Sequence, residues 1–354
     1  MTLEFTFFLA IVGILAAWVV LDGFDFGVGM LLRFLGRNEQ EREEVLDSIA
    51  PFWDGNEVLL VAAGGLLLAV FPTAFAVIFS GFYLPLMVFL WLIVFRALSL
   101  ELRHQLRNPL WREALDTAFV LSSLGLALIA GVALANLTRG VALNEEGHFF
   151  APLWTDFTVR GRVGILDWYT LLVGGYTVVI LARHGALWAC MRIEGPSADR
   201  ARAVAERLAW PVIIGAIVLA VGSYFGCRHL ADKVENAPAF AAILAIPPLA
   251  AWGSRGAHRA GRKRWAFLLS ATTLVALIAS AALALWPVIL PSTMTDRPGL
   301  SLLSASAGKS ALQTAWTWWL PGAGAAALWF VIVYGFLTRR TIRQNSLKSN
   351  SSDA

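Results

Sequence analysis

Cysteine, histidine and charged residues are all scarce in this chain. Its 354 residues include two cysteines and five histidines, and only 15% are Asp, Glu, Lys or Arg. Two cysteines cannot build a disulfide framework, and we expect Cys190 and Cys227, about a membrane thickness apart at opposite ends of two helices, to stay unpaired. Soluble domains contain about 25% charged residues, so this composition excludes an ordinary soluble protein.

Apolar residues fill the rest of the sequence. Hydrophobic residues make up 58% of the chain, with 15 Trp and 22 Phe, and the mean hydropathy is +0.67. Because a helix needs about 20 apolar residues to cross the hydrocarbon core, we predict an all-α polytopic bundle in one membrane domain, residues 1–344, with a disordered cytoplasmic tail at 345–354. The nine predicted spans are roughly 5–31, 53–71, 75–100, 115–137, 164–190, 208–228, 238–253, 264–287 and 316–338.

Basic residues give the expected orientation. If the N-terminus is outside, 21 of the 28 Lys and Arg residues fall in inner segments, which predicts an N-out, C-in topology with an odd number of spans. The pI near 9.3 then reflects inner loops that meet anionic lipid and not nucleic-acid binding. The seventh span is interrupted by Pro247-Pro248, and its loss would invert everything after it. No basic residue precedes the first apolar run, so we expect no cleaved signal peptide.

The connections between spans are short. The pattern of charged and apolar residues at 37–47 predicts an amphipathic helix on the inner surface. The other long connections, 138–163, 191–207 and 288–315, show no regular pattern. We therefore expect no second domain.

Two acidic motifs lie near one membrane face, where a membrane protein tolerates charge poorly. They are Leu21-Asp22-Gly23-Phe24-Asp25-Phe26-Gly27 at the end of the first span and Trp53-Asp54-Gly55-Asn56-Glu57 at the start of the second. A carboxylate at the centre of a membrane helix costs about 2.5–3.5 kcal/mol on insertion scales. Each motif places two acids three residues apart on one helix face, so we predict a single cluster of four carboxyls.

Glycine accounts for how such a cluster packs. Gly23 and Gly27 form a small-residue face on which another helix can approach closely, and Gly64-Gly65 offers the same in the second span. Two interpretations remain open for the acids. Each one alone can cap a helix end or pair with Arg33, Arg96 or Arg103. For the group we favour a proton pathway through Asp22, Asp25, Asp54 and Glu57, with Asp25 and Asp54 as the preferred carriers.

The order and spacing of these motifs resemble subunit II of cytochrome bd-type quinol oxidases. The same resemblance includes Ile49-Ala50-Pro51-Phe52 before the second motif, Phe79-Ser80-Gly81-Phe82-Tyr83, Phe95-Arg96-Ala97, His184-Gly185-Ala186 and Pro287. It extends over most of the chain and is strongest before residue 104. Two positions depart from the family pattern: Leu59 replaces a frequent Trp, and Asp167-Trp168 replaces Asn-Pro.

The resemblance implies a subunit of an electrogenic quinol:O₂ oxidoreductase in the bacterial inner membrane. It implies a heterodimer in which subunit I carries haem b and haem d, or b-type haems only, and oxidises quinol. This chain would support subunit I, take up protons from the cytoplasm and contribute to O₂ access, with Gly23, Gly27, Trp53 and Arg96 at packing or interface positions. A small accessory subunit and a structural quinone are compatible with it.

The histidines agree with haem ligation in the partner. All five fall in loops or near predicted helix ends, so no mid-membrane pair can hold a haem from both sides, and we expect neither a metal site nor a catalytic residue in this chain. The alternative function is a stand-alone proton- or ion-coupled transporter. Transporters usually bind substrate near the midplane on broken helices of paired repeats, whereas these acids gather at one face, so we favour the oxidase.

Overall fold

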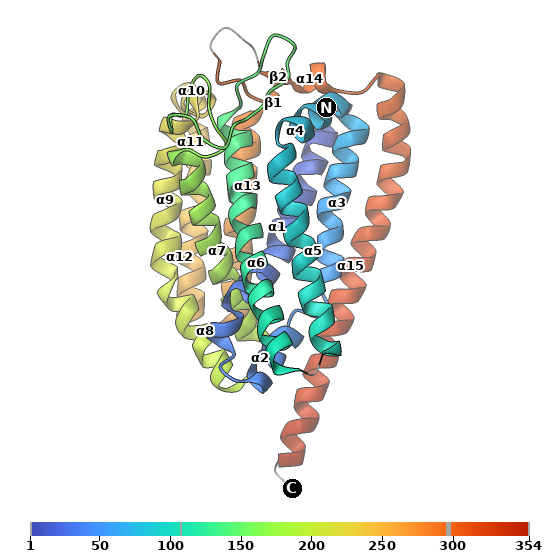
Figure 1. The fold of residues 1–354 in the computed structure, drawn as a ribbon, viewed down its shortest axis with the longest axis vertical. Coiled ribbons are helices and arrows are strands. Elements are labelled where there is room, and N and C mark those ends of the chain that lie inside the picture. The colour runs from blue at the N-terminus through green and yellow to red at the C-terminus, as the bar shows by residue number, and fades with distance from the viewer. Residues whose placement is uncertain (1, 107, 295–298, 353–354) are drawn as a thin grey trace.

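Long helices lying side by side form the body of the molecule in a computed structural model (Figure 1). The structure describes residues 2–106, 108–294 and 299–352, apart from the side chains of residues 104, 238, 239 and 336–352. The eight long apolar helices are α1 (Leu3–Leu35), α3 (Trp53–Val70), α5 (Tyr83–Gln105), α6 (Pro109–Arg139), α7 (Trp168–Arg192), α9 (Ala209–Gly226), α13 (Lys263–Leu285) and α15 (Lys309–Ser352). The predicted all-helical membrane bundle is confirmed.

Shorter elements close both ends of the bundle. At one end lie α2 (Glu39–Asp47) and α8 (Gly195–Arg207). Near the other end lie α4 (Pro72–Gly81), α10 (Arg228–Asn236), α11 (Pro238–Leu244), α14 (Leu302–Ala305) and a two-stranded antiparallel sheet of β1 (Val288–Leu290) and β2 (Leu300–Ser301). Helix α12 (Ile246–Arg259) runs along the bundle between its two ends.

Helix α2 confirms that a short helix with a buried apolar side follows the first span, and its place on the inner surface stays a prediction. Its buried residues are Val45 and Leu46, and Asn38 caps its first turn. Glu41 links it to α8 through an ion pair of 2.5 Å with Arg200. The Arg37 backbone N–H and this guanidinium lower the pKa of Glu41, which lies outside the spans.

One predicted boundary and the expectation of two irregular connections differ from the structure. The third span begins at Tyr83 and not near residue 75, because Phe82 ends α4 and starts a new helix. The connection at 191–207 contains the regular helix α8, with Ala198 and Ala201 buried on one face. The connection at 288–315 contains the β1–β2 pair and α14.

The seventh predicted span is the region of α10, α11 and α12. By length and composition the described chain has eight candidate spans, or nine if the bent pair of Arg228–Asn236 and Phe240–Arg259 counts as one. Lys233 donates to the carbonyls of Leu283 and Trp286 at one end of α13, whereas Arg259 pairs with Glu206 at the opposite end of the bundle. The chain therefore crosses from one end to the other between residues 233 and 259, which supports nine crossings.

Close packing of α1 against α7 fixes the centre of the bundle. A Cβ atom at Gly27 would lie 2.0 Å from the carbonyl oxygen of Leu181 and 2.8 Å from Cα of Gly185. A Cβ at Gly23 would lie 2.8 Å from the Leu181 side chain. The small-residue face predicted for α1 is thus occupied, whereas nothing lies within 4 Å of a Cβ at Gly64 or Gly65 among the described residues.

Two further predictions concern the cysteines and the C-terminal segment. Cys190 and Cys227 are both free, as predicted, and both are buried. The structure continues α15 to Ser352, and residues 353–354 lie outside the described residues, so the predicted disordered tail at 345–354 stays a prediction.

The orientation makes a first testable prediction. We expect a reporter that is active only in the cytoplasm to be active when fused after Ala354, and a reporter active only outside to be inactive there, because nine crossings from an outer N-terminus end inside. A fusion within the α10–α11 segment should show the opposite pattern. A C-terminus outside would contradict the combination of an outer N-terminus with nine crossings.

Candidate functional site

Arg96 on α5 is the centre of a buried charged cluster. Its side chain is 1% exposed, and Nη1 donates to Oε1 of Glu57 on α3 at 2.5 Å. Nη2 lies 3.6 Å from Oδ1 of Asp22 on α1. The guanidinium also lies over the rings of Phe26 and Phe119, 4.9 and 5.8 Å from their centroids. Arg96 therefore joins the acidic motifs of two different helices.

Each acid of α1 has its own additional hydrogen-bond donor. The indole Nε1 of Trp18, one turn earlier, donates to Oδ2 of Asp22 at 2.8 Å. The amide Nδ2 of Asn56 donates to Oδ2 of Asp25 at 2.8 Å and to the carbonyl of Leu21 at 3.1 Å. Asp22, Asp25 and Asn56 are all buried. Each of these carboxyl groups therefore accepts a hydrogen bond from a neutral donor that holds it in place.

A residue from the last helix completes this arrangement. The hydroxyl of Tyr334 on α15 donates to Oδ1 of Asn56 at 2.7 Å. With its oxygen held by Tyr334, the Asn56 amide presents its NH₂ group to Asp25. Trp329, also on α15, lies against Gly55, where a Cβ would be 2.8 Å from its ring. Helix α15 thus covers the start of α3 beside the cluster.

The structure brings together three of the four predicted carboxyls. Asp22 and Glu57 pair with Arg96, and Asp25 lies one turn along α1 from Asp22, whereas Asp54 is exposed. Helix α3 begins at Trp53, so Asp54 lies in its first turn, one turn nearer the helix end than Glu57, and its membership of a four-carboxyl cluster stays a prediction. Trp53 is half-buried and packs against the apolar core below the cluster.

Several polar atoms of the cluster keep free hydrogen-bonding capacity. Asp22 Oδ1, Asp25 Oδ1 and Arg96 Nε and Nη2 are buried and have no hydrogen-bond partner among the described residues. Three carboxyls face one guanidinium, so full ionisation would leave two negative charges uncompensated, which is costly inside a membrane. Carboxyl oxygens of this kind can accept and release protons.

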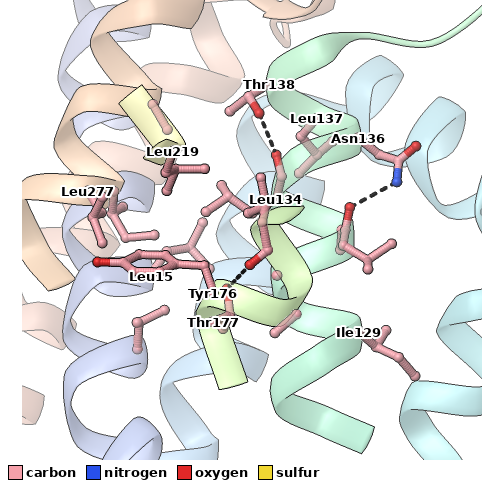
Figure 2. A pocket seen from close by; sticks show the side chains of 18 of the residues that line it. Leu15, Ile129, Leu134, Asn136, Leu137, Thr138, Tyr176, Thr177, Leu219 and Leu277 are labelled. Carbon is pink, nitrogen blue, oxygen red and sulfur yellow. Dashed lines mark hydrogen bonds between the residues drawn. The ribbon is translucent and has the colours of Figure 1, made fainter. Parts of the chain in front are cut away.

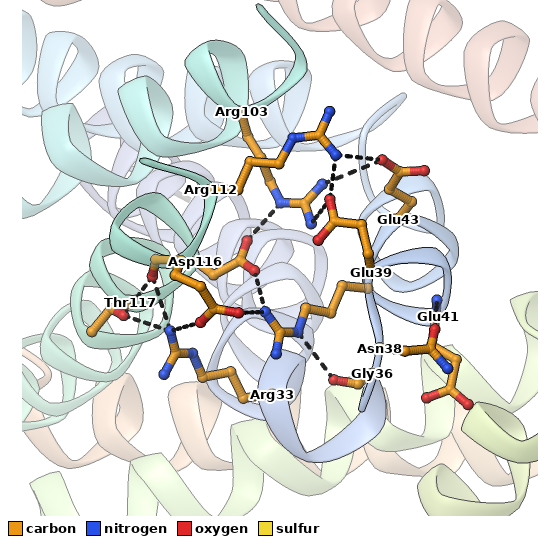
Figure 3. Close-up of polar contacts among 12 residues, drawn as sticks. Arg33, Gly36, Asn38, Glu39, Glu41, Glu43, Arg103, Arg112, Asp116 and Thr117 are labelled. Carbon is orange, nitrogen blue, oxygen red and sulfur yellow. Dashed lines mark hydrogen bonds and ion pairs between the residues drawn. The ribbon is translucent and has the colours of Figure 1, made fainter. Parts of the chain in front are cut away.

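The other arginines weighed as partners of these acids are engaged elsewhere (Figure 3). Arg103 Nε donates to Oδ1 of the buried Asp116 at 2.6 Å. Arg33 pairs with Glu113 at 2.7 Å, and Arg42 pairs with both Glu113 and Asp116. This network fastens α2 to α5 and α6 at the end of the bundle, and it leaves Arg96 as the cation that serves Asp22 and Glu57.

Trp18, Asn56 and Tyr334 are members of the site that sequence reasoning missed. Trp18 lies four residues before Asp22, which is a usable signal for a contact along a helix. Asn56 stands inside the second motif, between the two acids. Tyr334 is 278 residues from Asn56, and nothing in the sequence links the two.

Histidines and other ligand-type side chains do not form a metal-binding cluster in the described part of the chain. No group of three His, Cys, Asp or Glu residues could hold a metal ion in the part that the structure describes. His184 is buried about two turns before the end of α7. Its Nε2 lies 3.1 Å from the Val20 carbonyl and its Nδ1 lies 3.0 Å from Oγ of Ser270, so both ring nitrogens are already engaged.

An apolar cavity of about 350 Å³ lies among α1, α5, α6, α7, α9 and α13. Figure 2 shows Leu15, Leu134 and Leu277 around it, and most of its polar lining groups, including Thr138 and Thr177, already bond to nearby carbonyls. Trp18, the donor to Asp22, also lines this cavity. The cavity therefore reaches the edge of the charged cluster.

The unusual acid Asp167 has a structural role. It caps α7 by accepting from the backbone N–H groups of Tyr169 and Thr170 at 2.8 and 3.0 Å. It also forms a buried ion pair with Arg139. This acid lies at the end of the bundle opposite α2, far along the chain from the motifs of α1 and α3.

Comparison with known proteins gives consistent matches. The family model described as cytochrome bd terminal oxidase subunit II matches residues 3–340. The chain is 32% identical to a probable cytochrome oxidase subunit 2 of Haemophilus influenzae, over 85% of this chain and 84% of that protein. It is 28% identical to the cytochrome bd-I ubiquinol oxidase subunit 2 of Escherichia coli K12, over 97% of each. The fold matches a chain of the bd oxidase from Geobacillus thermodenitrificans with a TM-score of 0.71 at 16% identity, over 98% of each chain.

Proposed function

The chain belongs to the cytochrome bd terminal oxidase subunit II family, and from this premise we propose that it carries protons into its oxidase through the cluster around Arg96. It is a multi-pass membrane subunit of a bacterial respiratory quinol oxidase and acts together with subunit I. The relatives from Escherichia coli and Bacillus subtilis are named ubiquinol oxidase subunits, and we infer a quinol as the electron donor here as well.

We assign the haems to subunit I. The engaged ring nitrogens of His184 do not fit axial ligation, and the described residues hold no cluster that could bind a metal ion. Reduction of O₂ to water at haem in the partner consumes protons. The role proposed for this chain is to deliver them.

A gradient of exposure carries the proposal. Asp54 is exposed, the Glu57 side chain is 19% exposed, and the side chain of Asp22 is 2% exposed while Asp25 is fully buried. The acids therefore lead stepwise from the surface of this chain to its interior. Short water chains can connect carboxyls placed in this way.

Arg96 supplies the electrostatic balance of the route. It compensates one negative charge, and a proton that passes from one of the other carboxyls to the next leaves the net charge of the cluster unchanged. Asn56, oriented by Tyr334, keeps the inner acid Asp25 in place. Each residue thus has a distinct part: Asp54 and Glu57 accept protons, Arg96 balances charge, and Asp22 and Asp25 pass protons on.

The cytoplasm is the proposed source of these protons. The cluster lies toward the end of the bundle that carries α2, which the basic-residue distribution assigns to the inside. The full-length family match leaves no support for a stand-alone transporter. We further infer that the apolar cavity beside Trp18 gives O₂, or the apolar tail of a structural quinone, a space within this subunit.

The order of the route can be tested on its two outer acids. We expect Glu57→Gln to lower O₂ consumption per haem severalfold and Asp54→Asn to lower it less, since bulk water can replace an exposed carboxyl more easily than a half-buried one. Glu57→Asp should retain more activity than Glu57→Gln. The matched control is Glu43→Gln, which removes an exposed acid of α2 outside the route. Full turnover in both route variants would contradict the proposed pathway.

A further inference from the structure

Four unpaired cations gather where α8 meets α9 and α12 meets α13. Arg207, Arg262, Lys263 and Arg264 are exposed, and none of them pairs with an acid in the described ranges of the chain. Arg259, three residues before Arg262, pairs with Glu206, the neighbour of Arg207. This contact places the two helix junctions in one corner of the bundle.

The acid in this corner is already shared. Glu206 Oε1 accepts from Arg255 at 3.1 Å and from Arg259 at 2.5 Å. The single negative charge of this carboxylate is therefore already outweighed by two guanidinium groups, and it does not compensate the four exposed cations. The corner carries a concentrated positive charge that the protein itself does not compensate.

Another corner at the same end of the bundle is built differently. There Arg33, Arg42, Arg103 and Arg112 all pair with acids of α2 and α6 (Figure 3). Positive charge at this end of the molecule is thus neutralised at the α2 corner and left free at the α8–α13 corner. A general excess of inner basic residues does not account for that contrast.

Tryptophan side chains lie next to the free cations. Trp210 and Trp252 are 43% and 57% exposed and meet edge to face with ring centroids 5.5 Å apart. The Arg255 guanidinium lies 4.7 Å from the Trp210 ring centroid. Exposed indoles at this level are typical of the membrane interface. Farther along α9, Ile214 and Ile217 are 54% and 51% exposed and offer an apolar surface to acyl chains.

We propose that this corner binds an anionic phospholipid with two phosphates, of the diphosphatidylglycerol type. Four free cations match two phosphates, the indoles match the glycerol level, and the exposed face of α9 matches the acyl chains. The proposal rests on the membrane location of the chain and is independent of the proton route. Lipid binding and turnover can therefore fail separately.

Lipid retention measures this site directly. The oxidase complex is purified in mild detergent, exchanged into vesicles of phosphatidylcholine with 10% diphosphatidylglycerol, extracted again and weighed by native mass spectrometry. We expect the two-phosphate lipid to remain bound to the unaltered complex. In the variant Arg262→Gln, Lys263→Gln, Arg264→Gln its apparent affinity should fall at least about tenfold, because each basic residue near a membrane surface adds to anionic lipid binding. Arg112→Gln, which alters the paired corner, is the matched control.

The possible outcomes separate clearly. Loss of the lipid in the triple variant with retention in Arg112→Gln supports the site. Equal retention in all three complexes overturns it, and so does equal retention of phosphatidylcholine in place of the anionic lipid. Displacement of the lipid by 10 mM inorganic phosphate would also overturn it, because it would mean that the corner binds free anions without regard to the membrane.

Discussion

Asp25→Asn is expected to lower quinol-driven O₂ consumption per haem at least about tenfold, within the range by which a positioned proton-transfer group contributes. Asparagine keeps the shape of Asp25 and can still bond to the Asn56 amide, but it cannot ionise. Haem content and assembly should stay normal, since asparagine can replace the hydrogen bond that holds Asp25 to Asn56. Turnover is measured with excess quinol and divided by haem.

Two comparisons make this expectation decisive. Asp25→Glu restores a carboxyl and should retain more activity than the asparagine variant. Asp199→Asn removes an acid whose side chain is 70% exposed on α8, away from the cluster, and should have no effect. Normal turnover in Asp25→Asn would refute the proton role, and loss of assembled haem would instead support a purely structural role.

Gly27→Ala is expected to prevent normal assembly of the complex. The added methyl group would lie 2.0 Å from the Leu181 carbonyl, an approach that α1 and α7 must separate to relieve. Overpacking of this kind costs about 1–3 kcal/mol or more, and Gly27→Leu should be worse. The measurement is the amount of haem-bearing complex extracted per milligram of membrane and its midpoint of thermal unfolding.

A second glycine of the same helix provides the control. Nothing in the described chain lies within 4 Å of a Cβ at Gly13, so Gly13→Ala should leave the yield and stability of the complex unchanged. Equal yields for the two alanine variants would mean that the close α1–α7 contact is not needed for assembly of the complex.

Hydropathy predicted the long helices because the cost of burying polar backbone and side chains in lipid makes apolar runs of about 20 residues conspicuous. It missed features decided by contact. Helix α8 has a polar sequence, and its face with Ala198 and Ala201 is buried against the bundle. The break between α4 and α5 at Phe82 interrupts one continuous apolar run, so hydropathy alone does not mark it.

The candidate site was predictable in part for the same reason. Acids in an apolar span are costly to place in a membrane and can therefore be recognised in the sequence as functional candidates. The family resemblance included Arg96 as well. Which acids face inward depends on where α3 begins and how it packs on α1, so the exposure of Asp54 required the structure. The link from Asn56 to Tyr334 joins the second and last spans, and no local pattern could reveal it.

The lipid corner shows a similar limit. Counting basic residues assigns a side of the membrane to each loop, but it does not tell a paired arginine from a free one. Arg112 and Arg262 contribute equally to that count. Only their surroundings separate them, because acids of α2 surround the first and none pairs with the second among the described residues.

Proton uptake during a single turnover tests the central claim most directly. The fully reduced complex is mixed with O₂ in weakly buffered solution, and a pH dye and the haem spectrum are recorded together. If protons pass through the cluster around Arg96, the unaltered complex takes up protons as the haems oxidise, and Asp25→Asn oxidises haem while its proton uptake is delayed at least about tenfold. Proton uptake at the unaltered rate in Asp25→Asn would contradict the account.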